Sequence, residues 1–202
     1  MSKEEIGSII KTMSAPVDIN QVHLETPRLL LRPLTAADLA DVHAICSQPE
    51  VASTAGFPLC ENLEMSRNRL KEYMDDGETV AVVLKEDRKM IGTISLQKRN
   101  WQMYPLDRTL KGRELGFDLN KDYWGRGLMP EAVECLCNWC FEAWDYDFLT
   151  AGYFQGNSKS QRAIEKSGFT FLFEDDRTLP NGNTMHILTY IRYNSRKEPK
   201  DV

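Results

Sequence analysis

The segment from Asp122 to Ala132, DYWGRGLMPEA, contains the residues of this chain whose types and spacing suggest chemistry. Gly125 and Gly127 follow an apolar, strand-like run from Leu115 to Leu119 and directly precede a helical pattern. Because glycine has no Cβ, a phosphate group can approach the main chain closely at these positions. The first turn of a helix also leaves N–H groups without internal partners and carries positive potential. Together the strand, the glycine turn and the helix start predict a site for an anion, and we expect a pyrophosphate there.

Two other phosphate-binding motifs fit this segment poorly. In the dinucleotide-binding motif G-x-G-x-x-G, the third glycine would stand where this chain has Pro130. A P-loop would need a Gly-Lys-Ser/Thr ending, which is missing here. A G-x-G pair alone is weak evidence, since most such pairs are ordinary turns. The elements around the pair therefore decide the interpretation.

Length and charge limit the class of protein. The 202 residues suffice for one domain with a full core. A net charge of −5 argues against non-specific binding to nucleic acid, which needs a basic surface. No apolar run approaches the roughly 20 residues that span a bilayer, and Lys11 interrupts the apolar stretch that a signal peptide would need. We expect a cytoplasmic protein that binds neither nucleic acid nor a membrane.

The five cysteines are interpreted as reduced thiols, because their number is odd and no secretion signal precedes them. Cys135, Cys137 and Cys140 form a C-x-C-x-x-C pattern inside a predicted helix. A zinc site would need a fourth ligand, and the sequence offers none nearby. We therefore expect no metal site.

Hydrophobic periodicity predicts a mixed order of strands and helices rather than the regular alternation of a doubly wound fold. Strands are expected over residues 22–32, 79–84, 90–96, 114–119, 148–154, 170–174 and 184–192. Helices are expected over 35–45, 62–74, from the glycine turn to about 144, and over 158–167. The chain divides into an N-terminal extension (1–20), a single domain (21–193) and a charged flexible tail (194–202).

Two segments keep alternative interpretations. Residues 2–13 predict a short amphipathic helix that docks on its own domain or on a second subunit, and we favour its own domain. Residues 97–113 form a long polar connection that either closes over an acceptor or is a plain excursion of the chain.

Three blocks of sequence resemble the GNAT superfamily of N-acetyltransferases, in particular its branch of ribosomal-protein N-terminal (alanine/serine) acetyltransferases. The first block is LETPRLLLRPL at 24–34 with Asp38-Leu39. The second is ELGF at 114–117, running into YWGRG at 123–127 and Glu131-Ala132. The third is NSKS at 157–160, continuing to EKSGF at 165–169. The blocks are individually modest and jointly specific, and their order agrees from about residue 22 to 192.

The resemblance implies an α/β (α+β) fold of the GNAT acyl-CoA N-acyltransferase type. Such a fold has a central, mostly antiparallel mixed sheet flanked by helices, with the middle strands at 114–119 and 148–154 splayed apart. Acetyl-CoA, the co-substrate, would enter this notch, pair through its pantetheine arm with the main chain of 117–119 and seat its pyrophosphate at 124–129. The implied cofactor-binding residues are Phe117, Leu119, Trp124, Gly125, Arg126, Gly127, Leu128, Met129, Asn157 and Ser160.

The chain departs from the superfamily pattern at two of these positions. The motif usually has Gln or Arg where Trp124 stands, and Gly or Ala where Met129 stands. Pro130 lacks an N–H, yet it suits the first helical turn, where that donor has no internal acceptor.

By the same resemblance, Glu114 is the candidate general base and Ser160 the candidate acid near the thioester sulfur. Asn157 is expected to cap a helix and to contact coenzyme A. Each has a plainer alternative: a solvated edge residue for Glu114, a first-turn hydroxyl bonded to the backbone for Ser160, and a cap alone for Asn157. His23, His43 and His186 form no cluster and are interpreted as structural.

The expected activity is direct transfer of an acetyl group to a primary amine, namely the N-terminal α-amine of a protein such as a ribosomal protein. An α-amine has a pKa of about 7.7–8.0, so more of it is neutral near pH 7 than of a lysine, with a pKa of about 10.4. Two alternatives are an acetyltransferase for a small-molecule amine, such as a polyamine or an antibiotic, and a non-catalytic acyl-CoA-binding module. The sequence leaves open a monomer or a homodimer.

Overall fold

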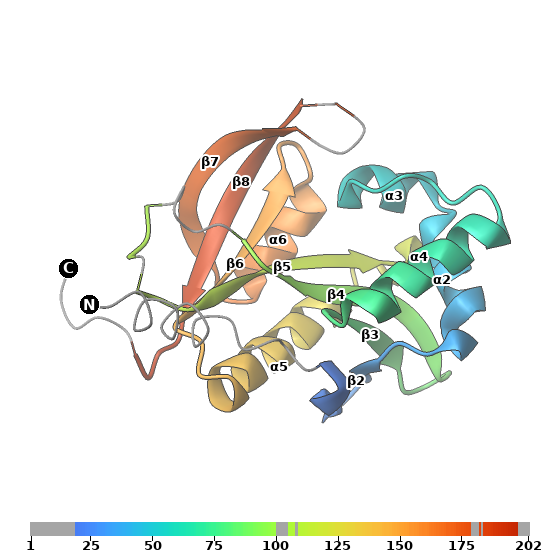
Figure 1. Ribbon diagram of the computed structural model, residues 1–202, viewed down its shortest axis with the longest axis horizontal. Helices are drawn as coiled ribbons and strands as arrows, with labels where there is room; N and C mark the ends of the chain where they lie inside the picture. The colour runs from blue at the N-terminus through green and yellow to red at the C-terminus, as the bar shows by residue number, and fades with distance from the viewer. Residues whose placement is uncertain (1–18, 100–104, 108, 179–181, 183, 198–202) are drawn as a thin grey trace, which may run out of the picture.

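One eight-stranded β-sheet runs through the structure (Figure 1), and two apolar cores lie on its opposite faces. The computed structural model describes residues 19–99, 105–107, 109–178, 182 and 184–197. The strands are β1 (Leu24–Glu25), β2 (Leu29–Pro33), β3 (Thr79–Leu84), β4 (Lys89–Gln97), β5 (Gly112–Leu119), β6 (Phe148–Phe154), β7 (Thr170–Thr178) and β8 (Thr184–Tyr193). The helices are α2 (Leu39–Cys46), α3 (Pro49–Ala55), α4 (Leu63–Asp76), α5 (Leu128–Ala143) and α6 (Ser158–Lys166), with short 3₁₀ turns η1 (Ile19–Gln21), η2 (Ala36–Asp38) and η4 (Lys121–Tyr123).

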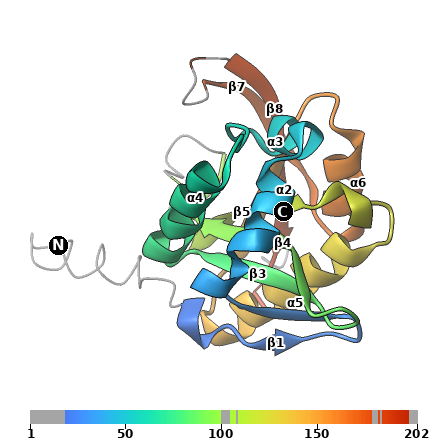
Figure 2. The same cartoon turned by 90° about the vertical axis from the view of Figure 1, so that its right-hand side faces the viewer.

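The strand order is β1-β2-β3-β4-β5-β6-β8-β7, and every pair is antiparallel except β5 with β6. Helices cover both faces of the sheet, with α2 and α4 on one face and α5 and α6 on the other, as the turned view in Figure 2 also shows. In β2 this arrangement sends Leu29 and Leu31 into the core beneath α5, whereas Leu30 packs against the core beneath α2. The predicted mostly antiparallel sheet flanked by helices is confirmed.

The two middle strands splay apart, as predicted. β5 and β6 pair only from Gly112 with Phe148 to Leu115 with Ala151. Beyond these pairs each strand keeps its other neighbour, β5 up to Leu119 and β6 up to Phe154. The two strands therefore diverge into a notch whose facing edges form no ladder with each other, as Figure 1 shows.

The structure corrects the first strand. The single strand expected over 22–32 is two short antiparallel strands, β1 and β2, joined by a turn at Thr26, Pro27 and Arg28. Proline lacks the N–H that a continuous ladder would need. The hydroxyl oxygen of Thr26 accepts a hydrogen bond from the Leu29 N–H at 2.9 Å, which closes the turn.

A further correction concerns helix α3, which the periodicity analysis missed. Its seven residues are too few for a clear helical pattern, although both of its ends carry signals. Pro49 stands at the first helical turn and Gly56, with a φ of +76°, ends the helix. The strands β5 and β7 are also longer than predicted and run from residue 112 and to residue 178.

The start of the segment expected to form a flexible tail is held against the domain. The side-chain amide of Asn194 donates to the Tyr146 carbonyl at 2.9 Å, and the Lys197 ammonium lies 3.1 Å from the Asp147 carboxylate. The helix expected over 2–13 and part of the connection expected over 97–113 lie outside the described residues. Within the described part of the chain, no helix combines the length and apolarity needed to cross a membrane.

Candidate functional site

The glycine turn lies between η4 and the start of α5. Gly125 and Gly127 have φ values of +77° and +71°, in the left-handed region that favours glycine. Gly127 is the N-cap of α5, so the first N–H groups of that helix lie next to it. A Cβ added at Gly125 would meet nothing within 4 Å. The turn therefore leaves open space directly over main-chain donors, as an anion site requires.

A cavity of about 360 Å³ opens beside this turn, between α3, β5 and α6. All predicted cofactor-binding residues except Arg126 line it: Phe117, Leu119, Trp124, Gly125, Gly127, Leu128, Met129, Asn157 and Ser160. The Arg126 guanidinium lies instead 5.4 Å from the centre of the Tyr123 ring and 4.0 Å from the Glu86 carboxylate. The structure thus brings predicted residues from the second and third sequence blocks into one cavity.

The sequence analysis missed two groups of lining residues. The first group is on α3, where Val51, Thr54 and Ala55 face the cavity. The second is a cationic row on α6, formed by Lys159, Arg162 and Lys166. These cations are three and four residues apart in the sequence, which puts them on one face of a helix. That spacing is the signal from which the row could have been predicted.

Trp124 braces the glycine turn against β5. Its indole N–H donates to the Leu119 carbonyl at 2.8 Å, and the Lys159 ammonium lies 4.1 Å from the centre of a Trp124 ring. The Leu119 carbonyl therefore already accepts a hydrogen bond from the protein itself.

Helix α3 bridges the two walls of the notch. At its amino end, the Gln48 side chain donates to Asn120 at 2.9 Å and accepts from the Lys121 N–H at 2.9 Å, both beyond the end of β5. At its carboxyl end, the Thr54 carbonyl accepts from the Asn157 side chain of the opposite wall at 3.3 Å. A helix fixed at both ends in this way closes one side of the cavity.

Asn157 and Ser160 begin helix α6. The Asn157 side-chain oxygen accepts from the Ser160 N–H at 3.1 Å, which is the predicted N-cap. Its side-chain nitrogen is engaged by Thr54, so both ends of the amide have protein partners. Ser160 lines the cavity, and its hydroxyl makes no hydrogen bond among the described residues.

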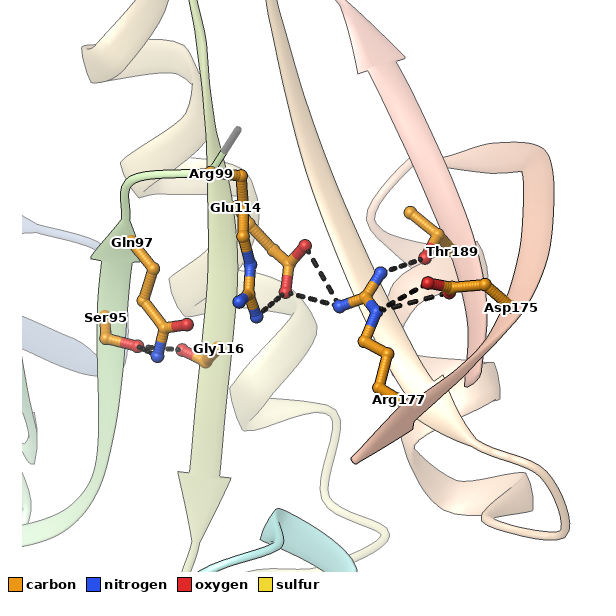
Figure 3. Close-up of polar contacts among 8 residues, drawn as sticks. All are labelled: Ser95, Gln97, Arg99, Glu114, Gly116, Asp175, Arg177 and Thr189. Carbon is orange, nitrogen blue, oxygen red and sulfur yellow. Dashed lines mark hydrogen bonds and ion pairs between the residues drawn. The ribbon is translucent and has the colours of Figure 1, made fainter. Parts of the chain in front are cut away.

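Glu114 lies at the vertex of the notch, one residue before the last β5–β6 pair, and is only 6% exposed (Figure 3). This burial excludes the alternative of a solvated edge residue. The Glu114 Oε1 atom accepts from Arg99 at 2.5 Å and from Arg177 at 3.2 Å. Among the described residues, the Oε2 atom has one long contact of 3.4 Å, again with Arg177.

Arg177 reaches Glu114 from β7, across the hairpin that β7 forms with β8 (Figure 3). Its Nε donates to both oxygens of Asp175 at 3.2 Å, and a terminal nitrogen donates to the Thr189 hydroxyl at 2.9 Å. A buried carboxylate needs such charged partners, because removing an unpaired charge from water costs several kcal/mol. Sequence reasoning did not find Arg99 or Arg177 as neighbours of Glu114, since no local pattern links them.

Asp118 is a second buried carboxyl group on the same strand, nine-tenths buried beside the cavity. Its Oδ2 accepts from the Thr93 hydroxyl at 2.7 Å, while Oδ1 has no partner among the described residues. Burial raises the pKa of Asp118 from its ordinary value of 3.8 to about 6, against a smaller lowering by the Thr93 hydrogen bond.

Replacing Asp118 with Asn is expected to flatten the pH dependence of stability. Because the folded-state pKa is raised, the folded protein binds the extra proton, and this stabilisation is present below pH 4 and lost as the pH rises through 6. Between pH 4.5 and 7.5 the variant should gain about 2 kcal/mol of unfolding free energy relative to the unmodified protein. Urea unfolding of the variant and of the unmodified protein at both pH values measures this. The prediction is contradicted if the difference in unfolding free energy between the two proteins is the same at pH 4.5 and at pH 7.5.

The five cysteines are free thiols, and Cys137 and Cys140 are fully buried on α5. In the described ranges no three His, Cys, Asp or Glu side chains gather as metal ligands would.

Comparison with known proteins agrees with this geometry. Residues 28–170 match the family model described as "Acetyltransferase (GNAT) domain". A curated relative, the uncharacterized N-acetyltransferase YoaA of Bacillus subtilis (strain 168), is 24% identical over 151 residues, which cover 72% of this chain and 81% of that protein.

Two solved structures share the fold. The GNAT family acetyltransferase from Bacillus anthracis has a TM-score of 0.72 at 21% identity and covers 85% of this chain and 98% of its own. The ribosomal-protein-S5-alanine acetyltransferase from Vibrio fischeri has a TM-score of 0.68 at 21% identity and covers 89% of this chain and 100% of its own.

Proposed function

The chain belongs to the GNAT acetyltransferase family and is an acetyl-transferring enzyme, and from this premise we propose that its acceptor is the N-terminal α-amine of a protein, with acetyl-CoA as donor. The observation that carries the proposal is the notch between β5 and β6, which has the glycine turn near its mouth and the buried Glu114 at its vertex.

The residues around the cavity fit acetyl-CoA. Gly125 and Gly127 leave main-chain donors open to a diphosphate, and the divergent edge of β5 offers hydrogen bonds to the amides of the pantetheine arm. The cationic row of Lys159, Arg162 and Lys166 supplies positive charge for the phosphates. The thioester would then lie toward the vertex of the notch.

In the proposed reaction the neutral amine nitrogen forms a bond to the thioester carbonyl carbon, and the carbon–sulfur bond breaks. The proton of the amine passes to Glu114, directly or through a water, and from there returns to solvent. The departing thiolate accepts a hydrogen bond from the Ser160 hydroxyl and takes up a solvent proton. Most of the rate enhancement comes from holding the two reactants together in the notch.

An α-amine suits this site better than a lysine. Glu114 shares its oxygens with Arg99 and Arg177, so it can offer only moderate help in removing a proton. An α-amine, with a pKa of about 7.7–8.0, needs only moderate help near neutral pH, whereas a lysine needs more. The fold shared with the ribosomal-protein-S5-alanine acetyltransferase from Vibrio fischeri points to the same acceptor class.

A thiol-release assay with a panel of amines tests the proposal. Peptides that begin with Ala or Ser are expected to release coenzyme A, whereas the same peptides with a blocked N-terminus and an internal lysine are not. Release with polyamines or aminoglycosides only would favour the small-molecule alternative. No release with any amine would contradict acetyl transfer by this chain.

Replacing Arg162 with Gln is expected to raise the KM for acetyl-CoA about tenfold while kcat stays within about twofold, because one charged hydrogen bond to a phosphate is lost. The effect should shrink as salt is added, since the cation row is open to solvent. The matched control is Lys71→Gln on α4, which removes an exposed lysine paired with Asp75. An unchanged KM at low salt would contradict a phosphate-binding role for the row.

A further inference from the structure

Arg28 links two sequence blocks that lie far apart in the chain. It stands in the turn between β1 and β2, yet its guanidinium donates to two carbonyls of the glycine turn. The distances are 2.9 Å to the Arg126 carbonyl and 3.2 Å to the Gly127 carbonyl, across 98 and 99 residues of sequence. The β1–β2 turn thus supports the glycine turn through these two carbonyls, although Arg28 is not among the residues that line the cavity.

The guanidinium is itself fixed by Glu131, in the first turn of α5. Arg28 Nε donates to one Glu131 oxygen at 2.7 Å, and the Arg28 main-chain N–H donates to the other at 3.1 Å. The Thr26 hydroxyl adds a hydrogen bond of 2.5 Å to the same carboxylate. The planar fork of an arginine can satisfy a carboxylate and two carbonyls at once, which an ammonium group cannot do with the same geometry.

This fork determines where the amides of the turn point. In a trans peptide the carbonyl and the N–H of the same peptide unit point in opposite directions. The carbonyls of Arg126 and Gly127 point toward Arg28, so the N–H groups of Gly127 and Leu128 point away from it. Gly127 and Leu128 line the cavity, on the side where a diphosphate would lie.

We propose that Arg28 is a positioning residue for coenzyme A, which holds two carbonyls outward so that the amides of Gly127 and Leu128 face the diphosphate. The inference rests on the proposed function in one respect, namely that this cavity takes acetyl-CoA. It does not depend on which amine accepts the acetyl group.

Calorimetric titration with coenzyme A tests the inference without any acceptor. Arg28→Gln and Arg28→Lys are both expected to raise the dissociation constant at least about tenfold, because neither side chain can hold both carbonyls and Glu131 together. If Arg28→Lys binds as tightly as the unmodified protein, long-range charge rather than the fork explains the role of Arg28, and the inference is overturned.

Lys85→Gln is the matched control. The Lys85 ammonium donates to the Thr26 carbonyl and to the Glu25 carboxylate, both at 2.7 Å. It therefore stabilises the same β1–β2 turn without contacting the glycine turn. Its removal should change the dissociation constant less than about twofold, and a loss as large as that of Arg28→Gln would show that general loosening of the turn suffices.

Hydrogen exchange with and without saturating coenzyme A gives a second readout. Coenzyme A should slow exchange at the amides of Gly127 and Leu128 in the unmodified protein and slow it less in Arg28→Gln, and the amides of β3 should exchange equally in both proteins. Equal slowing at both amides in the two proteins would overturn the inference. An unmodified protein that gives no heat with coenzyme A would overturn the assignment of the cavity, whereas binding without transfer to any amine would contradict the proposed reaction alone.

Discussion

Replacement of Gly127 with Val is expected to weaken coenzyme A binding about 100-fold, while the fold stays intact. A β-branched residue is strained at a φ of +71°, so the turn would have to change its backbone conformation. The added Cβ would lie 3.8 Å from the Arg28 guanidinium, an ordinary contact distance, so the effect comes from the backbone strain. Loss of two charged hydrogen bonds to a diphosphate, each contributing about 1.5–3 kcal/mol, accounts for the size of the effect.

The control for this substitution is Gly77→Val. Gly77 ends helix α4 with a φ of +60°, and a Cβ there would meet nothing within 4 Å, so the backbone strain is similar and the site is remote from the cavity. Both variants should melt at similarly reduced temperatures, but only Gly127→Val should lose affinity in calorimetry. Equal affinities for coenzyme A in the two variants would argue against a diphosphate at the glycine turn.

Replacement of Glu114 with Gln is expected to lower kcat/KM about 100-fold, and most strongly at low pH. Both arginines converge on Oε1, which leaves Oε2 as the oxygen that can accept a proton from the amine or from a bridging water. Below the α-amine pKa of about 7.7–8.0 most of the acceptor is charged, so the loss of a base matters most there. The measurement is the pH profile of kcat/KM with a peptide beginning with Ala or Ser.

Glu142→Gln serves as the control, because Glu142 is also paired with an arginine, Arg196, but lies exposed at the far end of α5. Its kcat/KM should equal that of the unmodified protein at each pH. Glu114→Gln also leaves Arg177 with a weaker partner, so melting curves must show that the variant is folded at the assay temperature. A loss that is the same at every pH, or no loss, would remove Glu114 from the role of base.

Features encoded within a few neighbouring residues could be predicted from the sequence. The conformation of the glycine turn follows from Gly125 and Gly127 themselves, and the Asn157 cap follows from its place before a helical pattern. Leu29 and Leu31 pack in one core and Leu30 packs against the other, which is the alternation of a strand covered on both faces. The order of elements and the family resemblance then gave the splayed sheet, which the pairing of β5 with β6 confirms.

Local sequence patterns did not predict the elements that are short or interrupted. Helix α3 has two turns at most, so its apolar positions could not be told from those of a loop. Pro27 divides a run of residues that otherwise reads as one strand. In both cases the prolines and the glycine at the boundaries of the elements, Pro49 with Gly56 and Pro27, indicated those boundaries better than the hydrophobic periodicity did.

The surroundings of the charged groups were decided only by the tertiary structure. Glu114 meets Arg99 and Arg177, 15 and 63 residues away, and Arg28 meets a turn almost 100 residues later. The backbone preference of a residue depends on its own side chain and its nearest neighbours, so the sequence alone determined the turn and the helix start. The partners of a buried charge depend on which distant strands the sheet brings together, and no spacing within one segment carries that information.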